Sequence, residues 1–161
     1  MQITVVCLGN ICRSPIGEAV LKDRIARAGL TDVHVDSAGT GSWHVGEGAN
    51  PKSVAVLTEA GYELDHVVRQ ITPHWIDDID LLLAMDTQNY HDLEQLIESS
   101  GAHTELHMFR HFDPELAHLD QPHPDLDVPD PYFSDVYAFR EVLAMVERAS
   151  DGVVIHITQT S

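Results

Sequence analysis

Positively charged residues are scarce in this sequence. Lys and Arg together number 9, against 26 Asp and Glu, and the formal net charge is −17 at pH 7. The imbalance is concentrated in residues 70–161, which hold 18 acids and 3 bases, whereas residues 1–69 hold 8 acids and 6 bases. Because nucleic acids and anionic membranes attract basic surfaces, we expect this chain to bind neither. A site for an anionic ligand is expected in residues 1–69, the less negative part.

Cysteine and long apolar runs are also scarce. The only cysteines are Cys7 and Cys12, which excludes a disulfide framework and a four-cysteine zinc site. No apolar run approaches the ~20 residues that span a membrane, and the N-terminus lacks the basic segment and apolar core of a signal peptide. The length of 161 residues and a hydrophobic content of 43% predict one globular domain over residues 1–161, located in the cytoplasm.

Short apolar segments alternate with helical patterns along the chain. Strands are expected at 2–6, 33–37, 81–85 and 105–108, and helices at 14–28, 51–60, 87–97 and 134–148, with a short helical turn within 71–78. This alternation predicts an α/β fold of three layers, with a central parallel sheet of about four strands and helices on both faces. Residues 113–131 are expected to form a long loop, and residues 151–157 to continue the last helix rather than form a strand.

The loop from Cys7 to Ser14 carries a Cys-x5-Arg-Ser pattern between the first strand and the first helix. A tight loop at a helix N-terminus directs backbone N–H groups at an anion, and the planar guanidinium of Arg13 can bind two phosphate oxygens. Gly9 is expected to let the backbone turn with positive φ, and Asn10 is among the few other residues that tolerate that region. The same positive field favours the thiolate of Cys7, to which Ser14 can donate a hydrogen bond. The pattern therefore predicts a phosphate site with a cysteine nucleophile.

Five segments in register give this sequence a resemblance to a known family. They are VCLGNICRSP, SAGTGSWHVGEGANP, DHVVRQIT, LLLAMDTQNYHDL and VPDPYF, and together they extend over nearly the whole chain. The chain resembles the low-molecular-weight protein tyrosine phosphatases. The resemblance implies hydrolysis of phosphotyrosine on protein substrates through a phosphocysteine on Cys7, with phosphate or another oxyanion held in the loop and without a metal or other cofactor.

The resemblance also implies roles for individual residues. Arg13 would bind the phosphoryl oxygens, and Asp130 would act as general acid toward the leaving oxygen and then as general base for water. The remaining members of the phosphate-binding loop would be Leu8, Gly9, Asn10, Ile11, Cys12 and Ser14. The residues supporting the site would be Ser37, His66 and Asp86, with Ser37 and His66 bracing Asn10. The rim that grips the aromatic ring would be formed by Trp43, Tyr132 and Phe133.

Several alternatives remain open at this stage. Asp125 and Asp127 are alternatives to Asp130 on composition alone, although only Asp130 both matches the family and precedes a rigidifying proline. An arsenate reductase-like enzyme is disfavoured because its chemistry needs further cysteines, and none follows Cys12. A non-catalytic phosphotyrosine-binding module is disfavoured because Cys7, Arg13 and Asp130 are all present.

Three further hypotheses concern other side chains. If residues 103–111 were helical, His103, His107 and His111 would share one face and could bind a metal, but no acidic or cysteine partner has clear ligand spacing, so we do not expect a metal site. Cys7 and Cys12 are close enough in sequence to form a reversible protective disulfide. The acidic residues 70–161 predict that highly acidic phosphopeptides are poor substrates.

Overall fold

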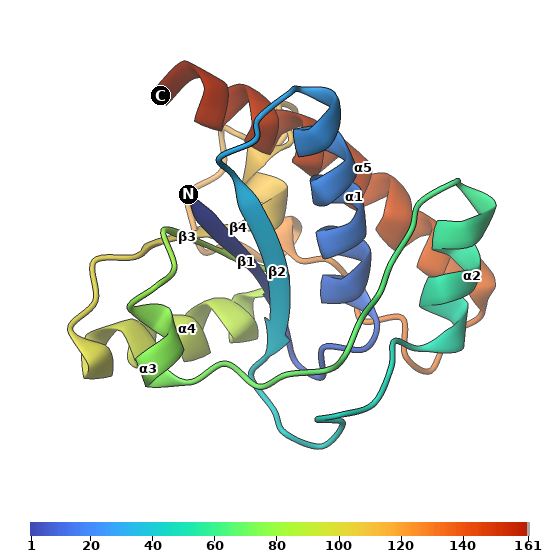
Figure 1. Ribbon diagram of the computed structural model, residues 1–161, viewed down its shortest axis with the longest axis horizontal. Helices are drawn as coiled ribbons and strands as arrows, with labels where there is room; N and C mark the ends of the chain where they lie inside the picture. Colours follow the sequence, from blue (N-terminus) through green and yellow to red (C-terminus); the bar gives the residue numbers. More distant parts are fainter. Residues whose placement is uncertain (161) are drawn as a thin grey trace.

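Four parallel strands form one sheet in the order β2-β1-β3-β4 (Figure 1). In this computed structural model, which describes residues 1–160, the strands are β1 Gln2–Cys7, β2 His34–Gly39, β3 Leu81–Ala84 and β4 Glu105–Met108. All four residues of β3 are buried, as expected for a central strand covered on both faces. In the register of the sheet, Cys7 pairs with Gly39 and Val6 pairs with Ala84, so the carboxyl ends of the three strands meet at one edge.

Helices cover both faces of the sheet (Figure 1). They are α1 Arg13–Arg27, α2 Pro51–Glu59, α3 Pro73–Ile76, α4 Thr87–Ser100 and α5 Val136–Thr160, with 3-10 turns η1 Phe109–Phe112 and η2 Pro124–Leu126. Alternate residues of β1 point to opposite faces: Ile3 and Val5 pack in one core cluster with α1 and α5, and Val6 packs in another with α3 and α4. The predicted three-layer α/β fold with a central four-stranded parallel sheet is confirmed.

The end of the chain is helical, as predicted. Residues 151–157 belong to α5, in which Val146, Val153 and Ile157 are buried at helical spacing. At Gly152 the helix passes so close to η1 that an added Cβ would lie 1.8 Å from the carbonyl oxygen of Phe112. Val153 and Ile157 therefore pack as part of one helical stripe against the apolar layer beside α1, whereas Ile155 is 54% exposed.

One local prediction was wrong, and the helix on which a shared histidine face depended does not form. Helix α1 begins at Arg13 rather than at Ser14, and its N-cap residue, Cys12, makes no side-chain capping bond. His107 lies in β4 and His111 in η1, so these histidines do not share a helical face with His103; the rings of His107 and His111 stack with centroids 6.3 Å apart. Within residues 1–160 no group of three or more His, Cys, Asp or Glu side chains is arranged to hold a metal ion.

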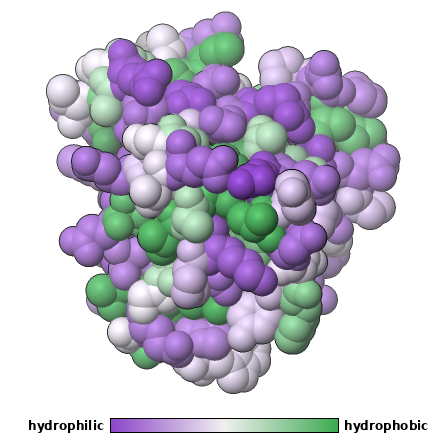
Figure 2. All heavy atoms as spheres, turned by 90° about the vertical axis from the view of Figure 1, so that its right-hand side faces the viewer, coloured by the Kyte–Doolittle hydropathy of each residue, from purple (hydrophilic) through white to green (hydrophobic). Residues whose placement is uncertain are grey.

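The outer surface is largely polar. In Figure 2, which shows the face that includes α2, hydrophilic residues predominate and the hydrophobic ones appear in small separate patches. Across residues 1–160, no helix has both the length and the apolar character needed to cross a membrane.

Candidate active site

The loop between β1 and α1 wraps around the sulfur of Cys7. Cys7 is 2% exposed, and its Sγ lies 3.0 Å from Ser14 Oγ and accepts a hydrogen bond from the backbone N–H of Asn10 at 3.3 Å. These two groups are placed to stabilise negative charge on sulfur. Asn10 adopts a φ of 58°, whereas Gly9 is not among the residues with positive φ, so the prediction of a left-handed turn at Gly9 was wrong.

The second cysteine of the loop is chemically different from the first. The pKa of Cys12 is raised to about 12, chiefly by burial and to a smaller extent by the neighbouring charges of Cys7 and Asp130. Because the thiolate is the nucleophilic form of cysteine and the Cys12 thiol stays protonated at neutral pH, Cys12 is a poorer candidate for the nucleophile than Cys7. Both cysteines are free in this structure.

Arg13 is the buried cation of the site and is 3% exposed. Its Nη1 donates to Asp86 Oδ2 at 2.6 Å and to the carbonyl of Val128 at 3.0 Å. Burial by itself would lower the pKa of Arg13, but the charges of Cys7 and Asp86 outweigh it and the pKa is raised. The two bonds at Nη1 fix the guanidinium plane, which leaves Nη2 facing Asp130, 3.8 Å from its Oδ2.

A chain of buried hydrogen bonds holds the loop in shape. The Asn10 side-chain amide donates to Ser14 Oγ at 2.8 Å and to Ser37 Oγ at 3.0 Å, and the Ser37 hydroxyl donates to Glu18 Oε1 at 2.7 Å. The ring of His66 contacts the carbonyl of Asn10 through Nε2 at 2.7 Å. The structure thus brings Ser37 and His66 to Asn10, where the resemblance expected them.

Of the three candidate acids in the long loop, only Asp130 lines the pocket above Cys7. Its Oδ1 accepts the backbone N–H of Tyr132 at 3.1 Å, and its side chain is 48% exposed. Asp127 instead accepts two hydrogen bonds from Thr87 at the start of α4, both at 2.8 Å. Asp125 is largely exposed and its nearest basic partner is His123, at 3.9 Å. Asp86 caps the N-terminus of α4 and reaches the site through Arg13 rather than lining the pocket.

The pocket above Cys7 has a volume of about 180 Å³ and an aromatic entrance. Trp43, Tyr132 and Phe133 line it together with Leu8 and Ile11. Tyr132 and Phe133 meet edge to face with ring centroids 4.8 Å apart, and Phe133 is 97% exposed. Apolar walls over a polar base suit a phosphate ester whose leaving group is an aromatic ring.

Comparison with known proteins agrees with this geometry. The family described as "Low molecular weight phosphotyrosine protein phosphatase" matches residues 2–160. The chain belongs to the low-molecular-weight protein tyrosine phosphatases. A phosphatase of this family from Streptomyces coelicolor is 43% identical over 159 residues, which are 98% of this chain and 94% of the relative. Protein-tyrosine phosphatase A of Mycobacterium tuberculosis is 41% identical over 157 residues, 95% of this chain and 89% of the relative.

Solved structures of the family superpose on the whole chain. A protein tyrosine phosphatase from Entamoeba histolytica has a TM-score of 0.86 at 31% identity, over 99% of this chain and 98% of its own. A Drosophila arginine phosphatase has a TM-score of 0.89 at 28% identity, over 98% of both chains. The same fold therefore occurs in a phosphatase named for tyrosine and in one named for arginine. The fold alone does not determine which phosphorylated residue is cleaved.

Sequence reasoning missed two residues of this phosphatase site. Glu18 is buried on α1 and ends the hydrogen-bond chain that begins at Asn10. A detectable signal was its position one helical turn after Ser14, on the face of α1 that carries apolar residues. His44 lines the pocket, and its ring centroid lies 6.5 Å from that of Tyr132, which is distant in the sequence. No local pattern indicated this residue.

Proposed function

We propose that this phosphatase hydrolyses phosphotyrosine in cytoplasmic proteins through a phosphocysteine on Cys7. The observation that carries the proposal is the convergence of three groups on one small pocket: the Cys7 sulfur at its base, the Arg13 guanidinium and the Asp130 carboxyl. A nucleophile, an oxyanion partner and a proton donor are the groups that displacement at phosphorus needs.

In the first step, Cys7 Sγ attacks phosphorus, the S–P bond forms and the bond from phosphorus to the phenolic oxygen breaks. The Asp130 carboxyl gives its proton to that oxygen, so the product leaves as a neutral tyrosine. Arg13 and the N–H groups at the start of α1, where no side chain caps the helix, balance the charge on the phosphoryl oxygens. In the second step, Asp130 takes a proton from water, the water oxygen bonds to phosphorus and Cys7 leaves as a thiolate stabilised by Ser14.

Turnover of p-nitrophenyl phosphate by paired cysteine variants tests this mechanism. Cys7→Ser should abolish activity, because the hydroxyl is a far weaker nucleophile and leaving group at neutral pH. The same change at Cys12 should preserve most of the activity, since its thiol stays protonated. Asp130→Ala should lower kcat about 10²–10⁴-fold, the usual contribution of a positioned general acid. Activity that survives Cys7→Ser would refute the mechanism.

Substrate choice requires a separate comparison. Phosphotyrosine and phosphoarginine peptides of otherwise identical sequence should differ in kcat/KM, with phosphotyrosine preferred. The support for this preference is the pocket itself, whose apolar walls at Leu8, Ile11 and Tyr132 match a planar ring better than a charged guanidinium. Preferred cleavage of phosphoarginine would leave the cysteine mechanism intact and contradict the substrate assignment.

A further inference from the structure

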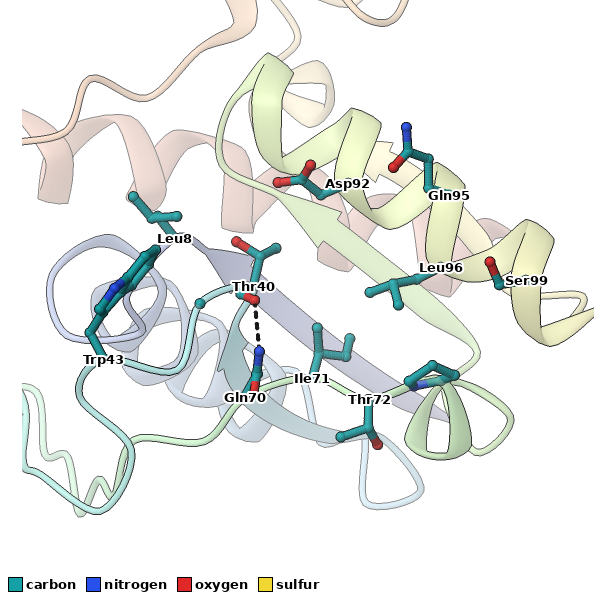
Figure 3. Close-up of a pocket in the computed structure, with 12 residues that line it drawn as sticks. Leu8, Thr40, Trp43, Gln70, Ile71, Thr72, Asp92, Gln95, Leu96 and Ser99 are labelled. Carbon is teal, nitrogen blue, oxygen red and sulfur yellow. Dashed lines mark hydrogen bonds between the residues drawn. The ribbon is translucent and has the colours of Figure 1, made fainter.

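A second and larger cavity adjoins the catalytic pocket. Its volume is about 680 Å³, within the range of known ligand sites. Leu8 and Trp43 line both cavities, so the larger one continues outward from the rim of the catalytic pocket. We call it the α4 groove, because its opposite wall is formed by α4 residues Asp92 to Ser99 (Figure 3).

Trp43 stands at the junction between the two cavities. Its indole rests against the backbone of Gly41, where an added Cβ would lie 2.0 Å from its Cζ3. The side chain is nevertheless 71% exposed, so a large part of the indole faces solvent between the two cavities. Figure 3 shows Trp43 beside Leu8 at one end of the groove, with the side chains of α4 at the other. A peptide that runs from the catalytic pocket into the groove therefore passes this indole.

The dimensions of the α4 groove suit a short stretch of extended polypeptide. Its α4 wall extends over eight residues, from Asp92 to Ser99, or roughly 10 Å at the helical rise per residue. An extended chain advances about 3.3 Å per residue, so roughly three residues fit along the wall. The groove offers apolar contact at Ile71 and Leu96. Its amide groups are Gln95 and Gln70, and the Nε2 of Gln70 already donates to the carbonyl of Thr40 at 3.1 Å. Apolar surface with a few polar groups is the mixture that ligand sites present.

The charge in the groove has one sign. Asp92 is the only charged residue among those that line it. Its carboxylate accepts a hydrogen bond from Gln88 Nε2 at 3.0 Å, and within residues 1–160 it forms no ion pair with a basic side chain. The exposed indole of Trp43 is also an attractive surface for a cation. Both features favour a lysine or arginine in whatever occupies the groove.

We propose that the α4 groove binds the residues of the protein substrate that flank its phosphotyrosine, and that Asp92 selects a lysine or arginine among them. The proposal rests on the proposed function, because the phosphotyrosine in the neighbouring pocket places the flanking residues at the mouth of the groove. It assigns α4 a part in choosing the substrate, in addition to its packing on the sheet.

A charge-reversal pair tests the proposal. Asp92→Lys places a cation in the groove. Glu94→Lys makes the same change in net charge two residues later, about 200° around the helix and outside the groove lining. Each variant and the unmodified chain is assayed with short phosphotyrosine peptides in which one arginine is moved, position by position, from one flank to the other. Turnover of p-nitrophenyl phosphate, which has no flanking residues, reports on the catalytic pocket alone.

We expect arginine at one or two adjacent positions on one flank to raise kcat/KM of the unmodified chain about two- to fivefold over alanine, the range of an exposed ion pair. Asp92→Lys should remove this preference or reverse it, and Glu94→Lys should keep it. Both variants should turn over p-nitrophenyl phosphate at the unmodified rate, and high salt should weaken the preference. The groove proposal would be overturned if the unmodified chain showed no arginine preference, or if the two variants showed the same preference. Either result would leave the phosphatase function intact. Absence of p-nitrophenyl phosphate turnover by the unmodified chain would instead overturn the proposed function, and the groove proposal with it.

Discussion

Replacing Glu18 by alanine should weaken both the stability and the activity of this phosphatase. The Glu18 carboxylate is buried on α1, where Oε1 accepts the Ser37 hydroxyl at 2.7 Å and Oε2 accepts Lys22 Nζ at 2.7 Å. Glu18→Ala removes both contacts. It leaves the Ser37 hydroxyl without an acceptor. Ser37 Oγ, which accepts a hydrogen bond from the Asn10 side-chain amide, is then no longer held in place by Glu18.

The size of the effect follows from the two contacts. A buried hydrogen bond to a charged group contributes about 1.5–3 kcal/mol. The contact to Lys22, whose side chain is 52% exposed, is screened by solvent and adds at most about 1 kcal/mol. Their sum is about 2–4 kcal/mol, which for a domain of this length lowers Tm by roughly 4–16 °C. Because the chain of bonds ends at Ser14 and Cys7, we also expect kcat/KM to fall roughly 10–100-fold through misplacement of the nucleophile.

Thermal unfolding followed by circular dichroism gives Tm, and p-nitrophenyl phosphate turnover well below Tm gives kcat/KM. Lys22→Met is the control, because it removes only the exposed contact. It should cost less than about 1 kcal/mol and leave turnover unchanged. Glu18→Gln, which keeps an oxygen acceptor for Ser37, should fall between the control and the alanine variant. A Glu18→Ala protein with the Tm and kcat/KM of the unmodified chain would refute the reasoning.

Two further predictions concern pH and oxidation. Burial lowers the pKa of His107 below its ordinary value of about 6.5. Gln121 Nε2 lies 3.0 Å from His107 Nδ1. The orientation of the Gln121 amide is fixed because its Oε1 accepts a hydrogen bond from the backbone N–H of Met108. The unfolded chain therefore binds more protons than the folded one below that value, so stability present above about pH 6.5 should be lost as the pH falls through the lowered pKa. Denaturant titrations at a series of pH values should show this loss of stability. His107→Leu should reduce the dependence of stability on pH, whereas the control His103→Leu, at an exposed position, should not. An unchanged pH dependence in the His107 variant would show that His107 is not the responsible group. Mild peroxide should join Cys7 to Cys12 reversibly, and mass spectrometry that finds only sulfinic or sulfonic acid at Cys7 would exclude this protection.

Much of the fold was predictable from local patterns. The apolar run at residues 81–84 is long enough for a buried strand and too short for an ordinary helix, and the structure confirms it as β3. The loop from Cys7 to Ser14 was also predictable, because a cysteine, an arginine and a helix start within eight residues constrain one another through the backbone. Asp130 was placed by the family resemblance, since composition alone left Asp125 and Asp127 as equal candidates.

Other features depended on which segments meet in space. The conformation of residues 151–157 was decided by the apolar layer beside α1, which a β-branched run covers as a helical stripe. The left-handed residue of the loop is Asn10 rather than Gly9, because the amide of Asn10 is bound simultaneously by Ser14 and Ser37 from two different elements.

The sequence by itself determined the layer order, the position of the Cys7–Ser14 loop between a strand and a helix, and the family, since each depends on spacings of a few residues or on segments matched along the chain. The tertiary structure decided that Glu18 supports the loop and that α4 and Trp43 form a groove beside the catalytic pocket. These features join residues that are tens of positions apart, and such contacts exist only once the sheet has brought the carboxyl ends of its strands to a common edge.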